Sequence, residues 1–306
     1  MATTNVELQQ NAPNSQQPAT TLSKKEQGYF GMVMKRFFKH KMAVFGLISF
    51  IALTLMAIFA PFIAPYDPYA MNSVFGGAPS ADHLLGTDQI GRDVLSRLIY
   101  ASRVSLVVGI GAVSIFVIIG TIVGAVSAYF GGWIDMVFMR ITDVFMAFPA
   151  LMLILVIVSI VGPSLTNLIL ILGLLGWPAV ARLVRGSVLS LKEMDFVKAA
   201  VALGYSTPRI LFLHILPNAI APVLVYATFG VASTILMEAA LSFLGLGVRP
   251  PTASWGNMLT DAQSLTVLTE MPWLWIPPGL MIVIAVLSIN FVGDGLRDAM
   301  DPKNMN

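Results

Sequence analysis

Three long stretches of this chain contain no charged side chain. They cover residues 104–134, 144–181 and 271–293. A helix needs about 20 apolar residues to cross the hydrocarbon core of a bilayer, where charged groups are costly. Only 11% of the 306 residues are charged, against about 25% in a soluble domain. The sequence therefore predicts an all-α, polytopic membrane protein.

The apolar segments divide into six predicted transmembrane helices. Gly131-Gly132 ends the second, and Gly162-Pro163 separates the third from the fourth. A five-span alternative, with a shorter third segment, would put segment 182–210 and the C-terminus on opposite sides. In the second span Gly120 and Gly124 form a GxxxG pattern, which favours close helix packing. The predicted spans are about 43–64, 104–129, 136–161, 164–181, 211–244 and 273–292.

The six spans form one predicted membrane domain, residues 43–306. Residues 1–27 are rich in Asn, Gln, Ser and Thr, and such a composition is typical of a disordered tail. Residues 28–42 form a basic segment before the first span. The net charge of +2 is spread over several loops, which gives no case for nucleic-acid binding.

The distribution of Lys and Arg predicts the orientation of the spans, because cytoplasmic loops carry an excess of these residues. With six spans, both termini and segment 182–210 share one side, while loops 65–103 and 245–272 share the other. The first side is predicted to be cytoplasmic because it carries the larger basic set: Lys24, Lys25, Lys35, Arg36, Lys39, Lys41, Arg182, Arg185, Lys192, Lys198, Arg209, Arg297 and Lys303. The second side carries Arg92, Arg97, Arg103 and Arg249.

Segment 182–210 is a polar island between two membrane-length apolar runs. Asp195 is expected to cap a short helix over 196–203, and Gly204 stands where a left-handed C-terminal residue is needed. Ser206 or Thr207 can cap the next helix, with Pro208 at its first position. Two interpretations of this helix–Gly–helix elbow remain open from the residues alone: an interfacial helix lying on lipid, or a rigid knob that fits a groove on a cytoplasmic protein.

A few polar residues in and near the spans are candidates for special roles. Glu238 lies in the fifth span, and an intramembrane carboxylate is a functional candidate by default. We predict a place in a translocation pathway or against a partner helix; the alternative is a carboxyl wetted at the outward end. Arg140 and Asp143 lie three residues apart in the third span and can pair there.

Catalytic, cofactor-binding and metal sites are not predicted. The chain has no cysteine, and no GxxxxGK[ST], HExxH or GxSxG motif occurs in it. Four residues of the loop before the second span resemble metal ligands in type, but their spacing fits no Ca²⁺ loop, and caps and turns explain them better. They are Asp82, His83, Asp88 and Asp93.

The stretch KAAVALGYSTPRILFLHILP, residues 198–217, resembles the EAA loop of ABC importer permeases. That motif reads Glu-Ala-Ala, three residues, Gly, nine residues, Ile, one residue, Leu-Pro. This chain departs from it twice, with Lys198 in place of Glu and His214 in place of Ile, so Glu193 or Asp195 is an alternative acidic contact. The resemblance implies ATPase coupling through Glu193, Asp195, Lys198, Ala199, Ala200, Gly204, Leu216 and Pro217.

Three further segments narrow the resemblance. LLGTDQIGRDVLSRLIYASRVSL (84–106), LSFLGLGVRPPTASWGNML (241–259) and GDGLRDAMDPK (293–303) together resemble the C-type permease subunit of dipeptide, oligopeptide and nickel importers, most of all an oligopeptide permease subunit. The resemblance runs from about residue 30 to the end. It implies a type I ABC importer permease fold in a bacterial inner membrane.

The same resemblance implies an assembly. Its members are a second six-span permease, two cytoplasmic ATPases that bind ATP and Mg²⁺, and an extracytoplasmic peptide-binding protein. This chain is then a non-catalytic subunit, with no cofactor of its own, that forms half of a peptide pathway. The alternatives are a stand-alone secondary transporter or channel, which would carry several intramembrane ionisable groups, and an importer of nickel or another small solute.

Overall fold

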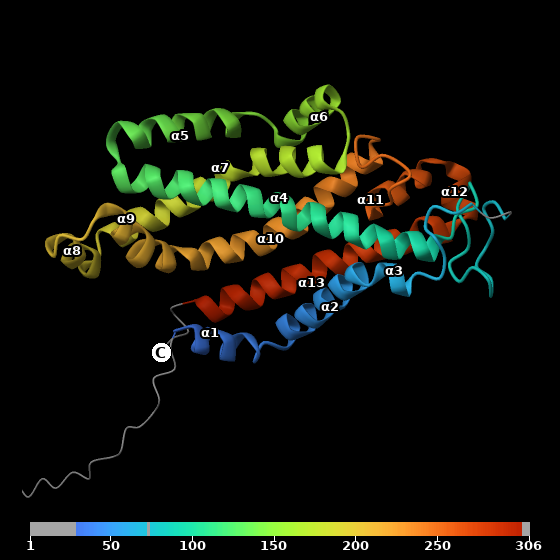
Figure 1. Ribbon diagram of the computed structural model, residues 1–306, viewed down its shortest axis with the longest axis horizontal. Helices are drawn as coiled ribbons and strands as arrows, with labels where there is room; N and C mark the ends of the chain where they lie inside the picture. Colours follow the sequence, from blue (N-terminus) through green and yellow to red (C-terminus); the bar gives the residue numbers. More distant parts are fainter. Residues whose placement is uncertain (1–28, 72–73, 302–306) are drawn as a thin grey trace, which may run out of the picture.

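The computed structural model describes residues 29–71 and 74–301. These residues form an elongated helical bundle (Figure 1). Five helices are long and apolar enough to cross a membrane, and a bent pair provides a sixth crossing if it counts as one span. The helices are α2 (Lys41–Ile58), α4 (Val94–Phe130), α7 (Leu165–Lys192), α10 (Leu216–Phe243, continuous with the two short helices before it) and α13 (Ile276–Met300).

The predicted third span is not one straight helix. The structure divides it into α5 (Gly132–Ala147) and α6 (Ala150–Val161), bent by 85°. The break falls at Phe148-Pro149, where Phe148 adopts extended angles of φ −94° and ψ 142°. A proline lacks an N–H and disfavours helical angles in the residue before it. The prediction of a continuous helix over 136–161 was therefore wrong.

Helix α4 is the longest of the bundle and begins earlier than predicted. Its 37 residues rise about 55 Å at 1.5 Å per residue, well beyond the roughly 30 Å hydrocarbon core. Asp93 begins it by accepting a hydrogen bond from the Ser96 N–H at 2.7 Å. The ten residues before the predicted start at 104 are thus helical, although the sequence placed them in a loop.

Helices α4 and α7 pack closely in the centre of the bundle. A Cβ added at Gly120 would collide with Val180, and one added at Gly124 would collide with the Ala181 carbonyl. The predicted packing role of the GxxxG pattern is confirmed, because only glycine permits this approach between two helix backbones.

The N-terminal helices lie on the other side of the bundle. Helix α1 (Tyr29–Phe37) buries Val33 and Phe37 against Ala43 of α2 and Ala299 of α13. Helix α3 (Ala60–Ile63) follows α2 after a break. The predicted disordered tail, residues 1–27, lies outside the described residues and stays a prediction.

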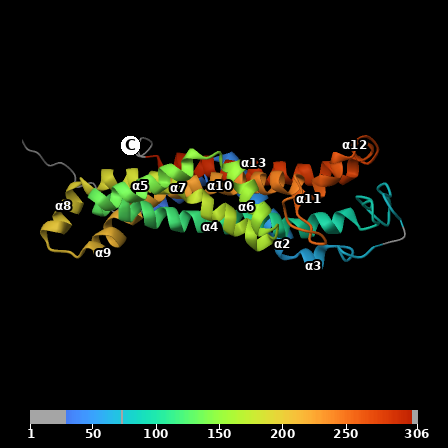
Figure 2. The same cartoon turned by 90° about the horizontal axis from the view of Figure 1, so that it is seen from above.

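The two ends of the bundle differ in structure. At one end lie α8 (Asp195–Ala202), α9 (Thr207–Arg209) and a π-helix, η1 (Ile210–Ile215). At the opposite end lie the loop before α4 and four short helices: α11 (Trp255–Met258), η2 (Leu259–Gln263), α12 (Leu265–Glu270) and η3 (Pro272–Leu274). Turned by 90°, the bundle is long and narrow, and α8 and α9 project from its tip (Figure 2).

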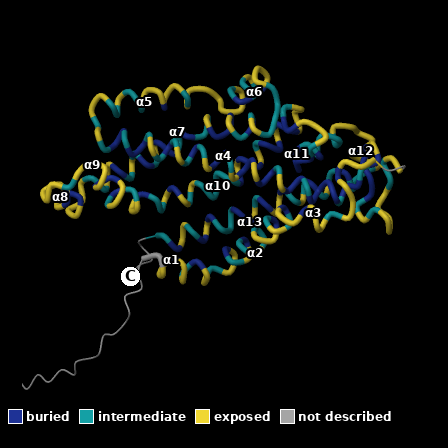
Figure 3. The backbone as a smooth tube through the Cα atoms, in the orientation of Figure 1, coloured by how far each residue is buried: buried dark blue, intermediate teal, exposed yellow. Residues whose placement is uncertain are grey.

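Helix α1 and the C-terminal end of α13 lie toward the same end as α8 (Figure 1). This arrangement agrees with the six-span topology, in which the two termini and the polar island share a side. Burial differs between the helices: α4 and α7 hold many buried residues, whereas α5, on the outside of the bundle, and α8, at its tip, are largely exposed (Figure 3).

Candidate functional site

The polar island folds as the helix–glycine–helix elbow that the sequence predicts. Helix α7 runs on to Lys192, α8 follows after two residues, and Gly204 then turns the chain toward α9. Gly204 has φ +76°, in the left-handed region that side chains with a Cβ disfavour. Its predicted place at a helix C-terminus is therefore confirmed.

Two details of the elbow differ from the prediction. Helix α8 begins at Asp195 itself, with Met194 as its N-cap and no side-chain capping bond, so the predicted cap by Asp195 was wrong. Its carboxylate instead lies in the first turn of α8, where a negative charge interacts favourably with the positive end of the helix dipole. Ser206 is the N-cap of α9 without a side-chain bond, and Pro208 is the second rather than the first helical residue.

Helix α8 presents apolar side chains to its surroundings. Met194, Val201 and Leu203 are 50%, 57% and 72% exposed, while Val197 and Ala200 are buried in the core cluster at this end of the bundle. Single exposed apolar residues are ordinary on a protein surface, but these three lie on or beside a helix that projects from the bundle, where a contiguous apolar patch would mark an interaction site.

The charged residues of the elbow pair with each other. The Lys198 ammonium lies 3.2 Å from the Glu193 carboxylate, and both side chains are mostly exposed. Such a surface pair contributes little to stability, so either residue can exchange its partner at small cost. Ala199 is exposed beside Lys198. Lys198, which replaces the usual Glu of the motif, thus stands beside the acidic group named as its alternative.

An aromatic stack joins the elbow to the next span. The rings of Tyr205 and His214 are stacked at 5.8 Å, and the Arg209 guanidinium lies 4.3 Å from the Tyr205 ring centre. His214 belongs to η1, which places Ile210 and Ile215 in the core. π-Helical turns are frequent at functional sites.

The Leu-Pro end of the motif begins the next span. Leu216 is the first residue of α10, and Pro217 is the second. Because η1 runs directly into α10, the N–H that Pro217 lacks falls at the junction of these two helices. The structure thus brings Lys198, Glu193 and Ala200 together in α8 and its neighbours, while Leu216 and Pro217 lie one helix further on. The sequence motif describes a joint between two helices rather than one contact patch.

At the opposite end, Glu238 is the centre of a buried network. Its side chain is 0% exposed, so the alternative of a wetted carboxyl was wrong. The carboxylate accepts hydrogen bonds from the hydroxyls of Ser242 at 2.7 Å, Ser254 at 2.8 Å and Ser105 at 3.3 Å. These residues come from α10, the cap of α11 and α4. The predicted role of Glu238 in a translocation pathway stays a prediction.

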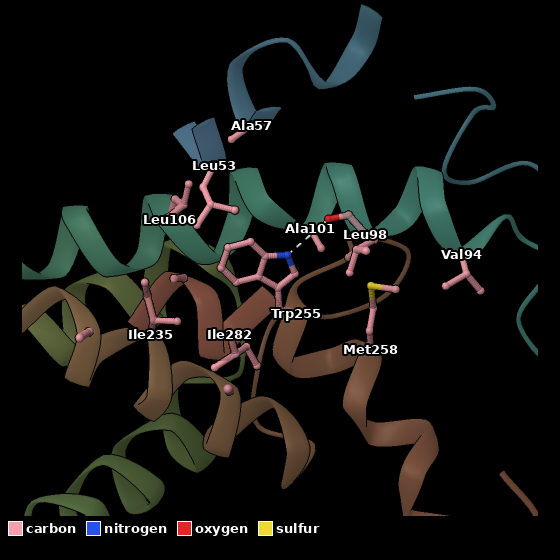
Figure 4. Packing of buried hydrophobic residues seen from close by; sticks show 14 of the residues in the cluster. Leu53, Ala57, Val94, Leu98, Ala101, Leu106, Ile235, Trp255, Met258 and Ile282 are labelled. Carbon is pink, nitrogen blue, oxygen red and sulfur yellow. Dashed lines mark hydrogen bonds between the residues drawn. The ribbon is translucent and has the colours of Figure 1, made fainter. Parts of the chain in front are cut away.

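Trp255 completes this network. Its backbone N–H donates to the Ser105 hydroxyl at 3.1 Å, and its indole N–H donates to the Leu98 carbonyl at 3.4 Å. The ring fills the core between α2, α4, α10 and α13 (Figure 4). Ser254 and Asn257 form a capping box around the start of α11. The loop after α10 is thereby fixed to the spans.

Ion pairs hold the loop before α4. Asp88 accepts from the Arg92 guanidinium at 2.7 Å and lies 3.5 Å from Arg97. His83 Nδ1 lies 2.9 Å from Asp93, the cap of α4. No group of three metal-ligand side chains exists among the described residues. For Asp88 and Asp93 the turn and cap interpretation is confirmed.

Asp261 of η2 faces this charged loop. Burial, and then the nearby Asp88 carboxylate, raises the pKa of Asp261, while Arg97 and Arg92 act against the rise. Segments 65–93 and 245–272, at the end of the bundle opposite the elbow, therefore share one electrostatic environment.

Helix α5 is attached to α7 by ion pairs that sequence reasoning missed. Arg185 donates to both oxygens of Asp135 at 2.6 Å, and Arg182 donates to Asp143 at 2.6 Å. The predicted pair of Arg140 with Asp143 exists at 3.8 Å, but Arg182 lies closer. No local pattern could have found these pairs, because their members lie 39 and 50 residues apart. The Ser254–Asn257 capping box is different: its i, i+3 spacing is a local signal.

Comparisons with known proteins cover nearly the whole described chain. The family described as "binding-protein-dependent transport system inner membrane component" matches residues 117–306. The family described as the N-terminal TM domain of oligopeptide transport permease C matches residues 28–77.

Several curated relatives align over most of their own length. The chain is 45% identical to the dipeptide transport system permease protein of Alkalihalophilus pseudofirmus, over 88% of each chain. It is 42% identical to the oligopeptide transport system permease protein of Bacillus subtilis, over 93% of each. It is 41% identical to the di/tripeptide transport system permease protein of Pseudomonas aeruginosa, over 88% of this chain and 91% of that one.

A solved structure supports the fold. The MetNI methionine ABC transporter in inward-facing conformations aligns with a TM-score of 0.55 and 19% identity, over 67% of this chain and 97% of that one. The predicted ABC importer permease fold is thereby confirmed. The chain belongs to the family of inner-membrane components of binding-protein-dependent transport systems, as a permease of the C type.

Proposed function

We propose that this chain is the membrane-spanning permease subunit of an ATP-driven ABC importer for peptides. It forms half of the pathway beside a second six-span permease. Two cytoplasmic ATPases bind and hydrolyse ATP with Mg²⁺, and an extracytoplasmic binding protein delivers the peptide. The peptide substrate is supported by relatives named as dipeptide and oligopeptide permeases; the chain itself performs no catalysis.

The observation that most supports this proposal is the elbow at Gly204. Helix α8 projects from the bundle with exposed apolar side chains, and one glycine at φ +76° fixes its angle to the following helix. Helix α8 packs against α7 and η1, and its buried Val197 and Ala200 belong to the core cluster that also includes residues of α4, α7 and α10. A partner groove that moves α8 would therefore move these spans with it, since packed cores shift between discrete arrangements rather than deform continuously.

The opposite end is suited to receive the binding protein. Loop 65–93 and segment 245–272 are fixed to each other and to the spans by the Asp88 and Glu238 networks. With the elbow in the cytoplasm, as the positive-inside rule favours, these segments face outward. Closure of the ATPases on the elbow and docking of the binding protein then bias one two-state element from its two ends.

The test is affinity purification of the tagged full chain from its native membrane, followed by mass spectrometry, an ATPase assay and peptide uptake in proteoliposomes. We expect a second permease and ATPases to copurify, and uptake of a radiolabelled tripeptide to require ATP and the binding protein. A chain that purifies alone and transports without ATP would contradict the proposal in favour of a secondary transporter. ATP-driven uptake of nickel but no peptide would contradict the substrate.

A further inference from the structure

A cavity of about 260 Å³ lies inside the bundle near the middle of α4 and α10. Phe116, Leu172, Ile154 and Phe229 form much of its apolar wall, contributed by α4, α7, α6 and α10. Ala150 and Ser233 also line it and are exposed, so the cavity opens beside the bend between α5 and α6. It is distinct from the elbow and from the Glu238 network.

Glycines create this space. A Cβ added at Gly176 would approach the Phe116 ring to 2.6 Å, and one added at Gly230 would approach it to 2.8 Å. The same ring packs edge-on against Tyr226, with 6.4 Å between ring centres. Two small residues and one ring–ring contact thus hold Phe116 as a fixed wall, so the cavity is largely pre-formed, as ligand sites usually are.

Three hydroxyls that line the cavity have no hydrogen-bond partner among the described residues: those of Tyr226, Ser233 and Thr234. Several hydroxyls elsewhere in the spans do have a partner, although the buried Thr121 hydroxyl of α4 also lacks one among the described residues. Thr54, Ser114, Ser159 and Thr228 each donate to a carbonyl of their own helix. A polar group in an apolar setting is costly unless it is hydrogen-bonded, so the three hydroxyls are suited to polar atoms of a ligand.

Size and chemistry together limit the occupant. An apolar cavity of about 150 Å³ binds benzene, so this larger one has room for one aromatic or branched side chain. A lipid tail could fill the apolar part but offers nothing to the hydroxyls. A peptide offers an apolar side chain together with backbone N–H and C=O groups.

We propose that this cavity is a subsite for one large apolar side chain of the transported peptide, whose backbone is hydrogen-bonded by Tyr226, Ser233 and Thr234. The inference rests on the proposed function. It adds a selectivity step within the permease, after the binding protein has released the peptide.

The test compares two peptides in the complete reconstituted importer. Ala-Phe-Ala and Ala-Ala-Ala are supplied on saturating binding protein, so that kcat reports steps after delivery. Ala150→Leu narrows the mouth at an exposed position. We expect it to lower kcat for Ala-Phe-Ala about tenfold, within the range for misfit of an apolar group in a pocket. We expect uptake of Ala-Ala-Ala to change less than about twofold on the same grounds.

A second pair of variants tests the hydroxyls without changing the volume. Thr234→Val should slow both peptides by roughly 2- to 10-fold, the value of one hydrogen bond. The matched control Thr54→Val removes a hydroxyl bonded to Phe50 on α2 and should leave both rates unchanged. Equal effects of the two variants would overturn the hydroxyl assignment.

A photoreactive peptide gives a direct readout. Ala-benzoylphenylalanine-Ala is trapped in the complex, irradiated and mapped by mass spectrometry. We expect labelling of cavity residues in α10 and its loss in Ala150→Leu. Labelling elsewhere, or equal slowing of both peptides by Ala150→Leu, would overturn the subsite while peptide transport stands. No uptake of either peptide by the unaltered importer would overturn the proposed function, and this inference with it.

Discussion

The two ends of this bundle differ in how far their polar and apolar side chains are buried and paired. The end with α11 is sealed: Glu238 and Trp255 are fully buried, and the Glu238 carboxylate receives three hydroxyl hydrogen bonds. The elbow end is open. Helix α8 lacks a side-chain cap, the ion pair between Lys198 and Glu193 is exposed, and several apolar side chains of the helix and its ends face outward.

The contrast shows which interactions fix the conformation of each end. A fully satisfied buried network holds one arrangement because any shift leaves a polar group unpaired. The elbow instead depends on Gly204 and on two inward-facing residues, so a bound partner can supply what the chain lacks. In the proposed importer, the end with α11 would keep its shape when the binding protein docks, and the elbow would transmit the movement of the ATPases.

The largest expected effect comes from breaking the sealed end with Glu238→Leu. Three serine hydroxyls lose their acceptor, and each unsatisfied buried group costs about 1–3 kcal/mol. We expect destabilisation on the order of 3 kcal/mol or more, measured as a fall in the thermal unfolding midpoint of the purified complex. Glu238→Gln keeps an acceptor oxygen and should lose less.

The matched control is Glu270→Leu, the same change at an exposed residue of α12, which should alter stability by less than about 0.5 kcal/mol. If Glu238→Leu were as stable as this control, the network would not hold the outward end.

An intermediate effect is expected at the elbow from Gly204→Val. A residue with a Cβ at this positive φ costs roughly 1–2 kcal/mol, and β-branching adds to it. The joint should therefore loosen, so that ATP hydrolysis continues while peptide uptake falls. The protein should remain in the membrane, because Gly204 lies outside the core. The measurement is the ratio of uptake to ATP hydrolysis in proteoliposomes.

Gly186→Val is the control for this change. Gly186 lies inside α7 with no atom within 4 Å of an added Cβ, and its backbone is helical. Helix propensity predicts no cost there, because Val is a better helix former than Gly. Normal coupling in Gly204→Val would contradict the elbow mechanism.

The smallest expected effect is the contribution of Asp261, at the sealed end, to the pH dependence of stability. Burial and Asp88 raise the pKa of Asp261 above 3.8 in the folded chain, so the folded state binds this proton more readily than the unfolded state. Stability from this group should rise as pH falls through the raised pKa toward 4. Unfolding midpoints of wild type and Asp261→Asn, compared from pH 7 to pH 4, should differ in slope in this direction. Parallel curves would contradict it.

Local sequence patterns predicted much of the fold. Charge-free runs located the spans because a membrane helix satisfies its own backbone hydrogen bonds. Gly120 and Gly124 indicated close packing, and Gly204 indicated a left-handed turn. Each rests on residues within one or two turns of each other, so the sequence displays it directly.

Other contacts join residues that are too far apart in the sequence for a local pattern to predict them. Ser105 and Trp255 meet across 150 positions, and Arg185 meets Asp135 across 50. Glu238 was found as a candidate, but its three serine partners were not. The error at Asp195 was local: the helix began one residue early, with Met194 as its cap.

The sequence by itself determined an all-helical membrane protein, its spans, its elbow and the end of the bundle that carries the basic residues, because these depend on local hydrogen bonding and on transfer of side chains into lipid. Only the tertiary structure decided the 85° bend, the sealed network around Glu238 and the cavity beside Phe116. Those depend on how surfaces of separate helices fit together, and that fit is set by packing among all of them at once.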